Sequence, residues 1–205
     1  MRVNTYSKKQ SSEQISRKLS EFIKEIQYKN RNPVDNNVLK MLQEMETNPE
    51  LLFDSQQYLY RSRIVHSKDK LNGEYPFFGF GKDGSFVAPS ECTKDMRANY
   101  RYIPYLYCAT RPYLSVVEVR PRLGARVSVA LIRVNERMRL LDFSLQNYPK
   151  GMKSVKINLF HALSQLYSKP VTEDDDTLDY IPTQYIAEFV KRIGYDGIVF
   201  KSSLY

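Results

Sequence analysis

The spacing of apolar residues changes near Tyr58, and this change divides the chain into two kinds of structure. Before Tyr58, apolar residues recur every three or four positions in two stretches, as they do in amphipathic helices. These residues are Ile15, Leu19, Phe22, Ile23 and Ile26, then Val38, Leu39, Leu42 and Met45. After it, segment 58–65 is rich in aromatic and β-branched residues and segment 125–134 alternates in polarity, which is typical of strands. The sequence predicts a helical N-terminal region over 1–57 and a second region over 58–205.

The second region is predicted to mix strands with helices. The expected elements are strands at 103–109, 139–144 and 195–203 and helices at 156–168 and 182–193. Gly194 follows the last of these helices, where a left-handed C-terminal cap belongs. Segment 111–119 fits either a short helix capped by Thr110 or a strand. Because strands and helices do not alternate regularly, the predicted fold class is α+β.

The positive charge of the chain is concentrated in its middle. The whole chain has 31 basic and 23 acidic residues, a formal charge of +8. Residues 61–150 hold 16 basic and 8 acidic residues, a difference of +8, and most of the basic ones are arginines. Such a concentrated field predicts an anionic partner: a nucleotide, a phosphate or nucleic acid. Arginine in particular suits paired contacts with phosphate oxygens.

Several classes of protein are not expected from this sequence. No apolar run approaches the roughly 20 residues of a membrane span, so no membrane association is expected. The cysteines, Cys92 and Cys108, form no CxxC pair, and there are two histidines, which makes a zinc site or any other metal site unexpected. No P-loop, HExxH or GxSxG motif is present. The composition fits a protein of the reducing cytoplasm.

Two features of the middle segment are candidates for chemistry. Glu118 is the one carboxylate in the otherwise apolar run 114–119, with arginines on both sides and tyrosines on its N-terminal side. Such an acid must face water, find a cationic partner or serve a ligand, because burying it alone is costly. Arg61 and Arg63 would share one face of the strand at 58–65, where they could line an exposed edge or the wall of an anion site.

The order and spacing of these residues resemble the RES-domain proteins, named for an Arg, a Glu and a Ser. Arg97 precedes Tyr107 by ten residues, and Tyr107 precedes Glu118 by eleven, in agreement with the family pattern. The matching segments are 59–63, 97–99, 103–109, 117–121, 180–189 and 196–203. The resemblance covers about residues 58–205. Because relatives generally continue through another strand after the serine, the resemblance also gives the expectation that this chain is truncated at its C-terminus.

The resemblance implies an ADP-ribosyltransferase-like fold, in which helices flank a mixed β core. It further implies an NAD-degrading toxin of a bacterial toxin–antitoxin pair, with a cognate antitoxin protein as partner. NAD would be the substrate, and inorganic phosphate a co-substrate where the cleavage is a phosphorolysis. The catalytic residues would be Glu118, Arg61 and Ser202, and the binding residues would be Arg97, Tyr107, Arg63 and Ser203. We therefore expect a buried Glu118 whose guanidinium neighbours converge with it on a single hollow sized for a dinucleotide. Arg61 is preferred over Arg63 because it directly follows Tyr60. Alternation on a strand turns only one of the adjacent serines toward a pocket, and Ser202 is preferred over Ser203.

Three functions remain open from the residues and the resemblance together. The first is NAD phosphorylase or glycohydrolase activity, in which Glu118 would stabilise an oxocarbenium-like ribose and arginines would hold phosphate oxygens. The second is mono-ADP-ribosyl transfer to a macromolecule, which would use the same residues. The third is non-catalytic nucleic-acid binding through the basic middle and its tyrosines. Nucleic acid is the less expected partner, because a carboxylate among the arginines would repel a phosphate backbone. The N-terminal helices could serve in packing, antitoxin docking or self-association.

Overall fold

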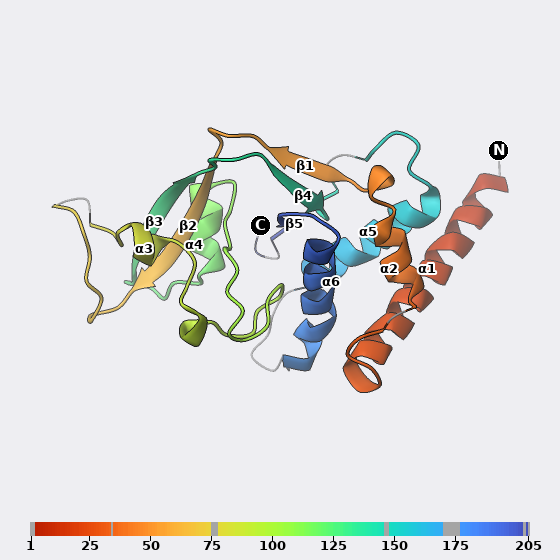
Figure 1. Cartoon of the computed structure of the whole chain (residues 1–205), viewed down its shortest axis with the longest axis horizontal. Helices are drawn as coiled ribbons and strands as arrows, with labels where there is room; N and C mark the ends of the chain where they lie inside the picture. Colours follow the sequence, from red (N-terminus) through yellow and green to blue (C-terminus); the bar gives the residue numbers. More distant parts are fainter. Residues whose placement is uncertain are drawn as a thin grey trace. The chain divides into compact units, whose positions relative to one another are not determined.

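A computed structural model describes residues 3–33, 35–74, 78–145, 148–169, 177–202 and 204 (Figure 1). The chain forms two compact units. The first unit comprises Met1–Leu52, Met96–Ala98 and Met138–Ser203, and the second comprises Phe53–Asp95, Asn99–Arg137 and Leu204–Tyr205. The combination of helices with small sheets confirms the α+β class.

The first unit carries most of the helices and a three-stranded sheet. Its helices are α1 (Val3–Tyr28), α2 (Asn37–Gln43), α5 (Ser154–Tyr167) and α6 (Ile181–Arg192), with 3-10 turns η1 (Met45–Thr47) and η3 (Thr177–Tyr180). The sheet has the order β1 (Glu50–Phe53), β4 (Met138–Asp142), β5 (Gly197–Val199), and β4 runs parallel to β5. The helices predicted from apolar spacing are therefore present, and Gly194 has the expected left-handed conformation, with φ of 98°.

The N-terminal helices are part of the core of the first unit. Helix α1 packs against α5 and α6 through its buried apolar stripe, which consists of Ile15, Leu19, Phe22 and Ile26. The ring of Phe22 meets that of Tyr185 on α6 edge-on, with centroids 6.0 Å apart. The first unit thus draws on both sides of the predicted boundary at residue 58, because the apolar faces of α1 and α5 cover each other.

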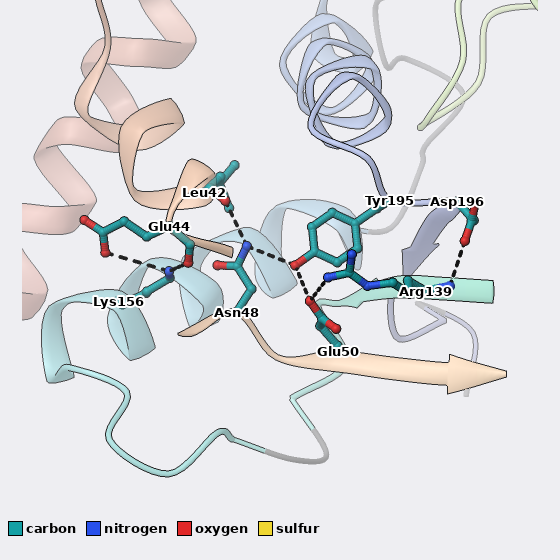
Figure 2. A network of polar contacts seen from close by, with 8 residues as sticks. All are labelled: Leu42, Glu44, Asn48, Glu50, Arg139, Lys156, Tyr195 and Asp196. Carbon is teal, nitrogen blue, oxygen red and sulfur yellow. Dashed lines mark hydrogen bonds and ion pairs between the residues drawn. The ribbon is translucent and has the colours of Figure 1, made fainter. Parts of the chain in front are cut away.

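A polar network ties the end of the N-terminal segment to the sheet (Figure 2). The buried Tyr195 hydroxyl donates to Glu50 Oε1 at 2.7 Å, and Arg139 Nη2 donates to the same oxygen at 2.8 Å. Asn48 Nδ2 donates to Leu42 O at 2.8 Å and to the Tyr195 hydroxyl at 3.3 Å. Burial and the Glu50 hydrogen bond raise the pKa of Tyr195, so its hydroxyl stays neutral and keeps its proton as a donor to the carboxylate.

The second unit is built around a two-stranded antiparallel sheet. Strand β2 (Tyr58–Val65) pairs with β3 (Arg126–Arg133), with Tyr58 opposite Arg133 and Val65 opposite Arg126. The other elements are α3 (Lys82–Ser85), the 3-10 turn η2 (Ser90–Cys92) and α4 (Pro112–Glu118). Helix α4 packs on β2 and β3, and the hydroxyl oxygens of Ser62 and Ser115 lie 2.7 Å apart between them. Segment 111–119 is therefore a helix, and its N-cap is Arg111 rather than Thr110.

Three predicted elements differ from the structure. Glu50–Phe53 is a strand inside the region predicted as helical. Segment 103–109 is not a buried strand: it forms a single bridge, between Ala109 and Tyr60, and Ile103 and Leu106 are exposed. Pro104, which has no N–H to donate to a sheet, lies within this segment. The last strand ends at Val199 instead of residue 203, so Ser202 follows the strand. None of the described helices combines the length with the apolar character that a membrane span requires.

Candidate functional site

Two arginine side chains of β2 converge on one backbone turn in the second unit. Arg61 and Arg63 share a face of the strand, as predicted, because they are two residues apart. Arg61 Nη1 donates to Ser85 O at 3.2 Å, and Arg63 Nη1 donates to Gly84 O. The Arg63 guanidinium also lies over the ring of Phe80, 4.0 Å from its centroid. We call Arg61 and Arg63, with this turn, the arginine face.

The arginine face carries positive charge that described residues do not neutralise. Both side chains are half-buried, and neither forms an ion pair with any carboxylate in the described part of the chain. Burial, and then the charge of Arg63, lower the pKa of Arg61. A guanidinium has five N–H donors, and within the described ranges each of these two bonds through one. The remaining N–H donors and the two positive charges could therefore bind an anion that has several oxygens.

A thiol lies beside Arg61, and sequence reasoning did not assign it to the site. Burial raises the pKa of Cys108 to about 11, while the Arg61 charge opposes this shift. The thiol is therefore protonated at neutral pH and is a poor nucleophile. The signal for it was its position directly after Tyr107 in the RES-like segment 103–109.

Tyr107 is anchored by a buried asparagine. Its hydroxyl donates to Asn99 Oδ1 at 2.8 Å. Asn99 is 1% exposed, and its Nδ2 donates to Lys94 O at 3.0 Å and to Tyr100 O at 2.9 Å. Asn99 thus fixes both the loop around it and the orientation of the Tyr107 ring. The sequence showed Asn99 as part of the RES-like segment 97–99 but gave no role for it.

Glu118 is not buried, which corrects the expectation of a buried glutamate. It is the last residue of α4 and is exposed, and its side chain has no hydrogen bond or ion pair with another described residue. Since Ser62 meets α4, strand alternation puts Arg61 and Arg63 on the opposite face of β2. The structure therefore does not join Glu118 to the arginine face by any described contact. The carboxylate is open to solvent and accessible to a ligand.

Arg97 and Ser202 belong to the first unit, whereas Arg61, Arg63, Tyr107 and Glu118 belong to the second. Arg97 Nη1 donates to Leu166 O at 3.0 Å, and its Nη2 donates to Lys169 O. These carbonyls are at the C-terminal end of α5, where a positive charge also offsets the helix dipole. Arg97 therefore stabilises the end of α5. Ser203 lies outside the described residues.

A cavity of about 510 Å³ occurs in the first unit, and none of the predicted site residues lines it. Its lining residues are Met45, Glu46, Asn48, Glu50, Arg139, Tyr148 and Pro149. Within the described ranges, no group of three or more His, Cys, Asp or Glu side chains could hold a metal ion. Among the described residues, the arginine face is therefore the arrangement best suited to bind a ligand, namely an anion.

Comparison with protein families supports the order of motifs seen in the sequence. The family model described as RES domain matches residues 59–204, which include the arginine face, Tyr107, Glu118 and Ser202. A search of curated proteins and a search of solved structures each found no match. The family match covers well over half of the chain and includes the second unit's sheet except for Tyr58. The chain belongs to the RES-domain family.

Proposed function

We propose that this chain cleaves NAD between nicotinamide and ribose, as the toxin of a toxin–antitoxin pair. The observation that carries the proposal is the arginine face, a half-buried pair of guanidiniums without a described carboxylate partner, in a chain of the RES-domain family. NAD presents a pyrophosphate with several oxygens, which is the chemistry that such a pair binds best. A cognate antitoxin protein would neutralise the activity in the cell.

In this proposal the reaction is a phosphorolysis. The bond between C1″ of the nicotinamide ribose and the nicotinamide nitrogen breaks, and nicotinamide leaves as a neutral molecule with the electron pair. A phosphate oxygen then forms the new bond to C1″, which gives ADP-ribose-1″-phosphate. The transition state carries positive charge on the ribose, as in glycoside cleavage. Glu118 would stabilise that charge and accept a hydrogen bond from a ribose hydroxyl.

The arginine face and Glu118 have separate roles in this proposal. Arg61 and Arg63 would hold the pyrophosphate or the attacking phosphate, and Tyr107 would stack on nicotinamide or bond the ribose. A dinucleotide presents its pyrophosphate and its nicotinamide ribose at separate points, so the carboxylate and the guanidiniums need not touch each other. Ser202 or Ser203 would bond a ribose hydroxyl or the carboxamide. Arg97 is proposed as a further phosphate contact in addition to its bonds to α5.

The test is an analysis of the products of NAD in the presence and absence of inorganic phosphate. We expect purified protein to consume NAD and to release ADP-ribose-1″-phosphate when phosphate is present. Free ADP-ribose at the same rate without phosphate would replace phosphorolysis with hydrolysis. With NAD labelled on its adenylate, label on a macromolecule would indicate ADP-ribosyl transfer. Salt-sensitive nucleic-acid binding without any NAD turnover would contradict the proposal.

A further inference from the structure

The two edges of the β2–β3 sheet differ in the part of the chain that the structure describes. The outer edge of β2 is covered at Tyr60, which exchanges two backbone hydrogen bonds of 2.8 Å with Ala109. The outer edge of β3 pairs with no described strand. An uncovered edge strand offers its backbone groups to another strand, and proteins usually cover or shorten such edges. At eight residues, β3 is long for an open edge.

The bonds of Tyr60 reveal which backbone groups of β3 face outward. Because Tyr60 directs its N–H and C=O to Ala109, the pair of Tyr60 with Leu131 is a non-hydrogen-bonded pair. Leu131 therefore directs both of its backbone groups away from β2. By alternation Val127, Val129 and Arg133 do the same, and no described residue accepts from or donates to these groups. The backbone N–H and C=O groups of these four alternate residues are thus free to pair with a further strand.

The side chains at this edge combine an apolar centre with basic ends. Val129 is 45% exposed and Leu131 is 57% exposed, and Tyr58 beside them on β2 is 50% exposed. At the two ends of β3, Arg126 and Arg133 are exposed and form no ion pair with a described carboxylate. Charges that only protect an edge are best placed at its middle, where they would block pairing. Here the middle of the edge is apolar.

We propose that the outer edge of β3 binds an extended, acidic segment of a partner polypeptide as a third strand. Backbone hydrogen bonds would supply affinity and alternate side chains would supply specificity, as in other cases of strand addition. The partner strand would place apolar side chains against Val129 and Leu131 and carboxylates against Arg126 and Arg133. A second copy of this chain fits poorly. Strand β3 has an arginine at each end and no carboxylate, so a second β3 strand would offer no negative charge to Arg126 and Arg133. This inference does not depend on NAD cleavage.

The test uses an acetylated and amidated octapeptide, Glu-Thr-Val-Thr-Val-Thr-Val-Glu, added to the ¹⁵N-labelled full chain. Paired antiparallel, it places valines opposite Leu131, Val129 and Val127 and glutamates opposite Arg133 and Arg126. We expect the amide signals of Val127, Val129, Leu131 and Arg133 to shift, because their N–H groups face outward. The matched peptide with lysine in place of both glutamates should bind at least about tenfold more weakly.

Two variants of the chain separate strand addition from adhesion to a basic surface. Val129→Pro removes an outward N–H without breaking a β2–β3 bond, so it should fold and lose peptide binding, whereas Val129→Thr keeps the amide and should bind. The double variant Arg126→Glu/Arg133→Glu, which keeps the backbone intact, should bind the lysine peptide instead. Unshifted β3 amides, equal binding of both peptides, or a dimer paired through β3 in sedimentation would each overturn the proposal.

Discussion

Glu118→Gln is expected to lower the rate of NAD consumption by about 100-fold or more, the typical effect of losing a group that stabilises transition-state charge. Glutamine keeps the size of the side chain and its hydrogen-bonding oxygen but removes the negative charge that would face the ribose cation. Glu118 is exposed at the end of α4 and bonds no described residue, so the substitution should leave the melting temperature unchanged. The loss would therefore be chemical, and it should appear in kcat with little change in KM.

Glu136→Gln is the matched control for this variant. Glu136 is also an exposed glutamate of the second unit, and no role in the site is proposed for it. Its NAD consumption should equal that of the unmodified chain. If Glu118→Gln consumed NAD as fast as this control, the assignment of Glu118 as the catalytic carboxylate would be refuted, even if the RES-domain family membership stood.

Phe22→Ala is expected to reduce the free energy of unfolding of the first unit by about 3–5 kcal/mol, as for other fully buried phenylalanines. The Phe22 side chain is 0% exposed and packs edge-on against Tyr185 of α6. Removing it would leave a cavity between α1 and the helices of the RES-domain region. Urea denaturation followed by circular dichroism measures the change.

Tyr28→Ala is the control in the same helix, because the Tyr28 side chain is 70% exposed. Its effect should be within about 0.5 kcal/mol. If Phe22→Ala were as stable as Tyr28→Ala, the N-terminal helices would form an appendage that folds independently of the RES-domain region. In that case a fragment of residues 58–205 should also remain folded. We expect instead that this fragment, which lacks α1, cannot fold the remainder of the first unit.

The fold could be predicted from sequence where one periodicity dominates a segment. Apolar spacing in α1 reflects a single buried face, and Phe22 is buried accordingly. Polarity alternation in β3 predicted the strand but not its buried face, because Ser128 is buried while Val129 and Leu131 are exposed. Short elements were not predicted correctly because their pairing partners are distant in sequence. Strand β1 depends on pairing with β4, some ninety residues later, and four residues of Glu50–Phe53 carry too little pattern to reveal it. Segment 103–109 is apolar enough for a strand, yet it forms one bridge.

The candidate site was predictable in its residue types and less so in its geometry. Alternation on β2 is sufficient to place Arg61 and Arg63 together, and the structure confirms that they share a face. Their partners, the carbonyl groups of Gly84 and Ser85, belong to the backbone and leave no mark in the sequence. The exposure of Glu118 was missed because an apolar run was taken as a sign of burial, whereas α4 ends at that residue and turns it to solvent.

The central claim is that the arginine face holds the phosphates of NAD. A crystal structure of Glu118→Gln with bound NAD tests this most directly, since the variant should bind the dinucleotide without consuming it. The account predicts pyrophosphate oxygens about 2.7–2.9 Å from the guanidinium nitrogens of Arg61 and Arg63. It would be contradicted by NAD bound with its pyrophosphate elsewhere, while both guanidiniums contact nothing beyond the carbonyl groups of Ser85 and Gly84.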